Sequence, residues 1–418
     1  MPESHGRAAP SEGSPVTPGV LRARRWLLWL YLASAVGVAL QRSLLSTENN
    51  FLILRTAFAH LASGQDLYAP YPLLHTDFFK YSPTFALLFA PFALLPLVPG
   101  YVLWAVVCAS AIYAAVSSAL SPRQAVVALA LAWLATVGDM QRSQSNVLCA
   151  GLMILAWAWY ERGGAWRPAM AIAAATFVKL FPVVALAFAV FRPRRIRSGL
   201  IFATVMLCGV ALPLLVTAPS SLATQYRSWY AIETRDVAPL ARYGTGGADL
   251  YAGIMGQFRV WWGVQWPHWP TQLAGVLLLL APLAFQRRRW GSRHFRLLFL
   301  ASILVFCVLF NHQAESPSYS IAIIGTSIWF AVSERAWWRT ALTAATLVIV
   351  DLMSTDLMPR AWYAGWYVPY LVKTVPLIPV WIAMQGELLG IIPNRDPSER
   401  AESDERRVTA PEALAQSR

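Results

Sequence analysis

Long apolar runs recur along this chain from Trp26 nearly to Leu389, and short arginine-containing loops separate many of them. Backbone N–H and C=O groups find no hydrogen-bonding partners in lipid, so apolar runs of this kind cross a bilayer as helices. Hydrophobic residues make up 57% of the 418 and charged residues only 13%, whereas soluble chains carry about a quarter charged residues. The sequence therefore predicts an all-α polytopic membrane protein with about 12 transmembrane helices.

The flanking segments are predicted from their composition. Residues 1–20 are rich in Pro, Ser and Gly, and together with residues 394–418 they are expected to be disordered and cytoplasmic. Residues 21–393 are expected to form a single transmembrane domain. Its first apolar run is too long for a signal-peptide core, and no small-residue cleavage site follows it, so it is predicted to stay as a helix. The predicted helices lie near 26–45, 98–120, 122–138, 145–160, 165–178, 181–191, 198–217, 271–286, 295–311, 317–333, 338–352 and 368–390.

The positions of the arginines predict the orientation. The net charge is +13, but 17 of the 34 basic residues lie in short loops on one side of this layout. Such loops face the cytoplasm under the positive-inside rule, so the charge is a topology signal and does not indicate nucleic-acid binding. Both termini are then cytoplasmic, in a cytoplasmic (inner) membrane. The four cysteines lie within apolar segments, which favours helix packing over disulfides or metal ligation.

Two long loops, about 46–99 and 217–270, fall on the predicted outer side. Within the first, Phe51–Ser63 has a helical pattern. Pro83–Pro96 is apolar, short and interrupted by proline, which favours a helix on or dipping into the outer surface. The second loop is rich in tryptophan, which is typical of anchoring at the interface, with stacking on sugar rings as the alternative.

A single lysine, Lys179, interrupts an apolar run near the outer side. A lysine facing lipid is costly, so it either snorkels from a helix end or lies in a protected cavity that binds an anion such as a lipid phosphate. Phosphate recognition usually employs several basic donors, so Arg142 and Lys80 are candidate partners.

The remaining polar residues of the outer side gather at helix ends. A general base requires a carboxylate, and the candidates are Glu48, Asp77, Asp139 and Glu315. His312 and Glu315 are three apart, but no other histidine has helpful spacing, so neither a metal nor a cofactor is expected. Hydrogen bonding to sugar hydroxyls is favoured, with a capped helix junction as the alternative. The candidate sugar- or acceptor-binding residues are Asn49, Asn50, Tyr81, Gln144, Asn146, His312, Gln313 and Glu315.

Several of these segments resemble one enzyme family. The first outer loop contains NNFLILRTAFAHLASGQDLYAPYP and then KYSPTFALLFAPFALLP. The next segment is QSNVLCAGLMILAWAWYERGGAWRPAMAIAAATFVKLFPVVAL, with a Gln/Asn turn, a helix, a short basic loop and a Lys followed closely by Pro. Together they resemble glycosyltransferase family 87, once a domain of unknown function, over about residues 26–390. The run NHQAESPSY resembles a segment of one bacterial branch of that family.

The resemblance implies a GT-C type fold with juxtamembrane helices on the outer face. It implies transfer of a sugar, with inversion and usually without metal, from a polyprenyl-phosphate-linked donor. The expected sugar is a hexose, mannose in particular, and the expected acceptor is lipid-linked or a glycan. Membrane lipids are further expected partners, and Lys179 is the expected partner of the donor phosphate.

One position departs from the family pattern. The usual Asp-Phe pair aligns best with Asn50-Phe51, and an amide cannot act as a general base. Glu48 is the nearest replacement and Asp77 the second, so these two are the predicted catalytic residues. A transporter or lipid flippase is the rival class, and a catalytically inactive homologue is a third interpretation. Transporters tend to have two related halves and polar residues near the midplane, whereas here the polar residues gather at outer helix ends.

Overall fold

The computed structural model describes residues 17–45, 49–236, 253–264, 266–355 and 357–394, and these residues form helices and connecting turns without any strand. The predicted base Glu48 lies outside them, as do the predicted disordered residues up to 16 and beyond 394. Helix α1 starts at Pro18 rather than Trp26, and Asn394 is bonded to Ser333 and Glu387. Helical structure therefore begins before residue 21, and Asn394 is joined to the bundle by hydrogen bonds.

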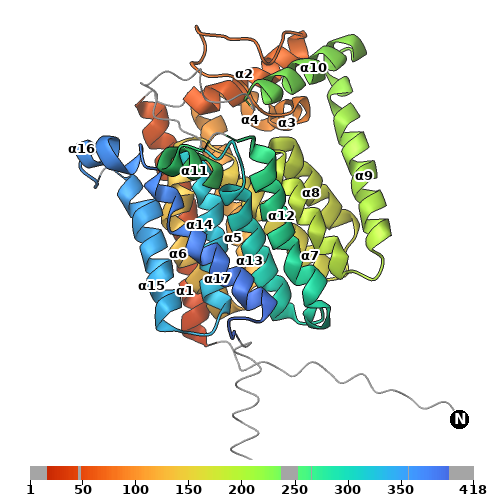
Figure 1. The fold of residues 1–418 in the computed structure, drawn as a ribbon. Coiled ribbons are helices and arrows are strands. Elements are labelled where there is room, and N and C mark those ends of the chain that lie inside the picture. The colour runs from red at the N-terminus through yellow and green to blue at the C-terminus, as the bar shows by residue number, and fades with distance from the viewer. Residues whose placement is uncertain (1–16, 46–48, 237–252, 265, 356, 395–418) are drawn as a thin grey trace, which may run out of the picture.

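The centre of the molecule is a bundle of roughly parallel and antiparallel helices (Figure 1). Within it α5 packs against α1 and α7, and α14 packs against α6 and α13. Large aromatic side chains such as Trp104, Trp157 and Trp329 are fully buried there. The bundle helices are α1 (Pro18–Leu44), α5 (Leu97–Ala119), α6 (Pro122–Gln141), α7 (Asn146–Glu161), α8 (Trp166–Val178), α12 (His268–Phe285), α13 (Arg293–Leu309), α14 (Tyr319–Val332), α15 (Trp337–Thr346) and α17 (Leu377–Leu389).

Within the part of the chain that the structure describes, five helical segments are long and apolar enough to cross a membrane: Pro18–Leu44, Leu97–Ala119, Pro122–Gln141, Arg195–Leu215 and His268–Phe285. A sixth is a pair, Arg360–Tyr367 with Val372–Leu389, bent by 77°. Asn146–Glu161, Phe181–Phe191 and Ser316–Val332 are apolar but shorter. The protein is thus a membrane protein built of helices, while the expected number of about 12 spans is not confirmed.

Four helices lie across one end of the bundle and form what we call the cap layer: α2 (Asn49–Ser63), α3 (Pro83–Leu88), α4 (Ala90–Ala93) and α10 (Pro219–Asp236) (Figure 1). The helical pattern of Phe51–Ser63 is therefore confirmed. The apolar stretch Pro83–Pro96 does not form one surface helix, because Phe89 and Pro91 divide it into α3 and α4, and Phe85 is buried.

Hydrogen bonds from short polar side chains hold α3 to the bundle. Ser82 caps α3 by accepting from the Phe85 N–H, and its hydroxyl donates to the carbonyl oxygen of Phe177 (2.6 Å). Thr84 donates to the carbonyl oxygen of Gly209 (2.9 Å). Gly209 has no room for a side chain, since a Cβ there would lie 2.2 Å from the Phe177 ring. These contacts fix the cap layer directly over the end of α8.

A long helical segment, Arg195–Leu215, leads from the bundle to the cap layer. The 3-10 helix η1 (Phe181–Phe191) follows α8, and α9 (Arg195–Ala211) leads through η2 (Leu212–Leu215) to α10. Helix α11 (Ile254–Trp262) lies near the same end as the cap layer (Figure 1). The remaining short elements are η3 (Arg287–Arg289), η4 (Ser316–Ser318), η5 (Leu347–Asp351), η6 (Leu352–Ser354), α16 (Arg360–Trp362), η7 (Tyr363–Tyr367) and η8 (Val372–Thr374).

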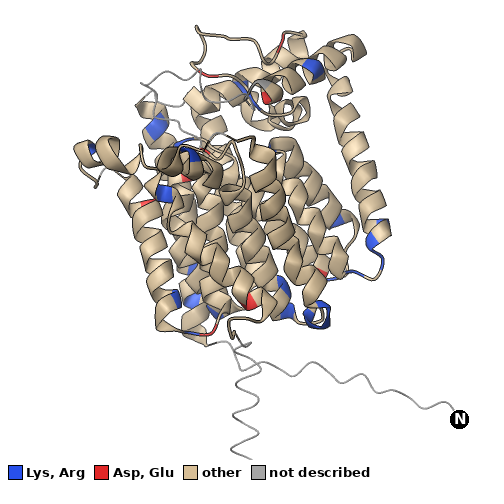
Figure 2. Cartoon of the chain, in the orientation of Figure 1, with Lys and Arg blue, Asp and Glu red and all other residues tan. Residues whose placement is uncertain are grey.

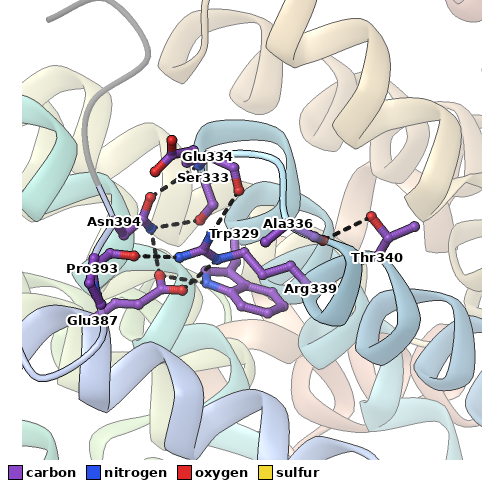
Figure 3. A network of polar contacts seen from close by, with 9 residues as sticks. All are labelled: Trp329, Ser333, Glu334, Ala336, Arg339, Thr340, Glu387, Pro393 and Asn394. Atoms are coloured by element: carbon purple, nitrogen blue, oxygen red, sulfur yellow. Dashed lines mark hydrogen bonds and ion pairs between the residues drawn. The ribbon is translucent and has the colours of Figure 1, made fainter. Parts of the chain in front are cut away.

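Basic residues gather at the end of the bundle opposite the cap layer (Figure 2). They include Arg123 at the start of α6, Arg162 directly after α7, Arg167 at the start of α8, and the run Arg287–Arg289. One charged cluster at this end is buried: Arg339 and Glu387 form an ion pair of 2.8 Å, and Glu387 also accepts from Trp329 and Asn394 (Figure 3). The charge asymmetry on which the predicted orientation depends is thus present in the fold.

Candidate active site

A cavity of about 460 Å³ lies where the cap layer meets the bundle. Its wall is contributed by α2, the segment 77–81, the turn before α7, the α8–η1 junction, α10, α12, α13 and the segment 311–318. Residues far apart in sequence thus meet at one place. Nine of the 13 predicted site residues line it: Asn50, Asp77, Lys80, Tyr81, Gln144, Lys179, His312, Gln313 and Glu315.

The cavity has one apolar wall as well as this polar one. Val178, Leu180 and Phe181 come from the α8–η1 junction, and Val276, Phe306 and Phe310 come from α12 and α13. A site with apolar lining and a few convergent polar groups is the usual form of a small-molecule pocket. This arrangement suits a ligand that joins a polar head to an apolar chain.

Lys179 lies at the end of α8, where the helix stops and the backbone becomes extended (φ −143°, ψ 146°). Pro182 follows within the first turn of η1, and proline disfavours a continuous helix through this point. The break turns the lysine toward the cavity, and its Nζ donates to Oδ1 of Asn146 (2.7 Å).

Asn146 in turn is held by Asp139, the acid near the end of α6. The Asn146 Nδ2 donates to Asp139 Oδ1 (2.9 Å), and the first N–H groups of α7 include that of Val147, which donates to Oδ2 (3.1 Å). Ser320 of α14 donates to Oδ1 as well (3.2 Å). Asp139 is buried and does not line the cavity. Its geometry is that of a carboxylate that fixes neighbouring groups, so it is a poor candidate for the base.

The electrostatic surroundings keep Lys179 protonated. Burial by itself disfavours the ammonium, but Tyr81, Glu315, Cys149 and Asp139 outweigh it and raise the pKa of Lys179 above its ordinary value. Burial raises the pKa of Tyr81, and the lysine charge partly opposes that rise. At neutral pH the cavity therefore contains a fixed cation beside a neutral phenol.

The two other predicted basic partners are placed differently. Lys80 lines the cavity with Lys179. Arg142 does not, because its guanidinium turns toward Ser316 (Nη1 to Oγ, 3.5 Å). The backbone carbonyl of Arg142 accepts a hydrogen bond from Asn50 Nδ2 (2.7 Å). Asn50 thus serves as a hydrogen-bond donor at the cavity rim.

The predicted acidic and amide residues also differ in whether they line the cavity. Asp77 lines the cavity, and its Oδ1 accepts from the Phe78 N–H (2.7 Å). Asn49 does not line it, since its side chain accepts from the Thr76 N–H (2.9 Å) and ties α2 to this segment. Asn146 also stays behind the wall, where it holds Lys179.

The segment 311–318 closes the cavity on another side. His312 Nδ1 lies 3.1 Å from Gln272 Nε2, and Gln313 Nε2 lies 3.5 Å from Glu233 Oε2. Among the residues that the structure describes, no three His, Cys, Asp or Glu side chains are grouped as a metal site. The donors and acceptors of His312 and Gln313 suit hydrogen bonding to hydroxyl groups.

Two polar cavity residues on distant helices, Glu233 of α10 and Gln272 of α12, were not singled out from the sequence. The second long loop showed its tryptophans but gave no reason to single out Glu233. Glu233 reaches the cavity because α10 packs against α3 and η2 and because Gln225 is hydrogen-bonded to the backbone of Gln65 and Leu67.

Two solved structures of an oligosaccharyltransferase from Archaeoglobus fulgidus show a distant similarity. The apo form shares 11% identity at a TM-score of 0.40, covering 85% of this chain and 56% of that one. The enzyme AglB in complex with an inhibitory peptide and a dolichol-phosphate shares 14% identity at a TM-score of 0.37, covering 87% and 56%. The chain therefore spans little more than half the length of those proteins. No curated protein matches the sequence.

The sequence model of one family matches the chain directly. It covers residues 78–311, which include the segment from Lys80 through the α8–η1 junction to α13. Lys179, Glu233 and Gln272 of the cavity lie inside the match, and His312, Gln313 and Glu315 directly follow it. Because this match extends over more than half of the sequence, the chain belongs to glycosyltransferase family 87.

Proposed function

We propose that this protein is a GT-C type glycosyltransferase that uses a polyprenyl-phosphate-linked sugar as donor. The sugar is a hexose, for which mannose is the first candidate, and the acceptor is lipid-linked or a glycan. Transfer occurs with inversion on the outer face of the cytoplasmic membrane. Family membership supports the glycosyltransferase activity, and the donor, sugar and acceptor are the proposal.

The observation that carries the proposal is the position of Lys179. Its ammonium lies at the wall of the cavity, is held by the buried Asn146, and adjoins the apolar surface of Leu180 and Phe181. A polyprenyl phosphate has the matching order of groups, an apolar chain next to a phosphate. Charge-assisted hydrogen bonds from Lys179 and Lys80 would bind that phosphate.

The same cation assists the reaction. The acceptor oxygen attacks the anomeric carbon, the bond from that carbon to the phosphate oxygen breaks, and polyprenyl phosphate leaves with the bonding electrons. Negative charge grows on the phosphate as this bond breaks, and a fixed ammonium in a partly dry cavity stabilises it. The sugar would lie between Lys179 and the polar segment 311–318, where Gln144, His312 and Gln313 contact its hydroxyls.

The acceptor proton must go to a carboxylate, and Asp77 is our candidate among the described residues. It lines the cavity, and its Oδ1 is oriented by a backbone N–H. Glu315 also lines the cavity, but its charge helps to raise the pKa of Lys179, so we assign it to the support of that ammonium. Glu48 stays a candidate base, since it directly precedes the N-terminus of α2.

The orientation follows from the distribution of charge. The arginine-rich end of the bundle is placed in the cytoplasm, so the cap layer and cavity face outward. The donor chain would then lie in the outer half of the bilayer.

A reconstituted transfer assay tests the proposal. Purified protein in liposomes is supplied with a radiolabelled polyprenyl-phosphate hexose and a mixed lipid extract as acceptor. We expect a labelled product with the wild type and a loss of at least 100-fold with Lys179→Gln. Uptake of labelled solute without any glycosyl product would instead favour a transporter, and the assignment of the base fails if Asp77→Asn and Glu48→Gln both retain full activity.

A further inference from the structure

A second pair of basic side chains lies just outside the cavity, on the other side of the turn at Ser316. Lys373 Nζ donates to the backbone oxygen of Ser316 (3.1 Å) and to its Oγ (3.0 Å). Arg142 Nη1 lies 3.5 Å from the same Oγ. Two cations from distant parts of the chain therefore converge on one serine.

The positive charge of this pair is not neutralised by contact with an acid. Among the residues that the structure describes, neither cation has a carboxylate within ion-pair distance. The acid whose charge reaches Lys373 is Asp351, yet Asp351 Oδ2 is buried without a hydrogen-bond partner. Like charges at close range repel, so an anion bound between the two basic groups would stabilise the arrangement.

Lys373 is buried, whereas Arg142 is exposed. Only 9% of Lys373 is exposed, and its ammonium lies 5.1 Å from the centroid of the Tyr319 ring. An ammonium has three donors, of which two are used here, and a guanidinium has five. Donors of both groups thus remain for a ligand that arrives from the outer surface.

The local backbone is shaped for this placement. Leu371, two residues before Lys373, adopts left-handed values (φ 50°), and so does Ser143, directly after Arg142 (φ 51°). No other non-glycine residue of the described chain has a positive φ. Such conformations persist where surrounding contacts impose them, and they often accompany binding sites.

We propose that Arg142 and Lys373 form a second anion site that binds a phosphate group, namely that of a phospholipid-type acceptor. The planar guanidinium of Arg142 and the ammonium of Lys373 can together donate hydrogen bonds to several oxygens of one phosphate. In this assignment Arg142 serves the acceptor, whereas the sequence indicated the donor phosphate.

The site adjoins the cavity closely enough for an acceptor to reach both. Ser316 lies between Glu315 and Ser318, which line the cavity. The backbone oxygen of Arg142 is bonded to Asn50, which also lines it. An acceptor anchored by its phosphate at Arg142 and Lys373 would extend its hydroxyls over this shared wall toward the donor sugar. This role in catalysis rests on the proposed function, but phosphate binding does not.

Binding is tested on the full-length protein in detergent by isothermal titration with dioctanoyl phosphatidate. We expect two sites in the wild type. Lys373→Gln and Arg142→Gln should each weaken one of them at least tenfold, and Lys179→Gln should weaken the other. Arg360→Gln, which removes an exposed arginine of the same outer region, is the matched control and should bind as the wild type does. Dioctanoylglycerol, which lacks the phosphate, should not bind.

Competition with inorganic phosphate tests whether the site recognises a phosphate group alone or the headgroup of a lipid. Competition by millimolar phosphate at the Arg142–Lys373 site supports recognition of the phosphate alone, and binding of phosphatidate without such competition supports recognition of a lipid headgroup. The inference is overturned if Arg142→Gln, which changes an exposed side chain, and Lys373→Gln both leave stoichiometry and affinity unchanged.

Transfer kinetics distinguish this inference from the proposed function. With active protein, Lys373→Gln should raise KM for the acceptor about tenfold and leave KM for the donor unchanged. If no donor supports transfer but the two-site binding persists, the proposed function fails and the anion site stands.

Discussion

The ammonium of Lys179 lies 2.7 Å from the side-chain oxygen of Asn146, and the amide nitrogen of the same asparagine lies 2.9 Å from Asp139. One asparagine thus connects a buried acid at the end of α6 with the cation at the end of α8. Because the acid accepts from the amide nitrogen, the amide oxygen must face the lysine. Asp139 therefore orients Lys179, the proposed partner of the donor phosphate, through Asn146.

Removing the amide should release Lys179. We expect Asn146→Ala to raise KM for the polyprenyl-phosphate donor about tenfold, because one charge-assisted hydrogen bond that fixes the ammonium is lost. Lys179→Arg, which retains the charge, should keep more activity than Lys179→Gln. Steady-state kinetics at varied donor concentration provide the measurement, and an unchanged donor KM in Asn146→Ala would count against the positioning role.

Asp139 is expected to act on structure and position and not as a base. Asp139→Asn removes the negative charge that accepts from Asn146, Val147 and Ser320. We expect a lower melting temperature, by roughly 5 °C or more, because a buried network loses its acceptor. Ser320→Ala, which removes only the longest of these bonds, is the milder control. If Asp139→Asn stays folded and abolishes the acidic limb of the kcat pH profile, along which activity falls as the base is protonated, Asp139 is the base after all.

Restoring the family's usual aspartate at Asn50 should not improve this enzyme. Asn50 Nδ2 donates to the Arg142 carbonyl at 2.7 Å, so Asn50→Asp would put a carboxylate oxygen against a carbonyl oxygen. We expect transfer activity to fall severalfold, measured with the same donor and acceptor as for the wild type. A gain in kcat would show that position 50 supplies the base when it carries an acid.

The buried ion pair at the arginine-rich end of the bundle should dominate stability there. Glu387→Gln leaves Arg339 buried without its counter-ion (Figure 3), which should cost about 3–5 kcal/mol. The ion pair between Glu161 and Arg296 is 2.7 Å long, close to the 2.8 Å of the Glu387–Arg339 pair, but the side chains of Glu161 and Arg296 are 20% and 16% exposed. Glu161→Gln should therefore cost only about 1 kcal/mol or less. Thermal unfolding in detergent compares the two, and equal losses would contradict this difference in burial.

The sequence predicted the helices well and the contacts between them only partly. Apolar runs and arginine loops located most helices within a few residues, and Lys179 was visible because it interrupts such a run. The lengths of the spans could not be predicted in the same way, since helices such as α7 and α14 are short and are buried by their neighbours.

Contacts between distant segments account for the remaining differences. Asp139, Asn146 and Arg142 belong to one polar turn, and the sequence offered no basis for separating their roles. Their roles differ because Asn146 faces Lys179, whereas Arg142 faces Ser316 and the buried Lys373. Glu233 and Lys373 were not singled out, since only tertiary packing brings α10 over the cavity and η8 beside the turn at Ser316.

The most direct test of the central claim is sugar transfer by the purified protein in proteoliposomes, with labelled polyprenyl-phosphate hexoses supplied one at a time and the anomeric configuration of the product determined. We predict a glycosylated lipid or glycan of inverted configuration from one donor, and almost none with Lys179→Gln. Full activity of folded Lys179→Gln, or transfer only from a soluble nucleotide sugar, would contradict the account.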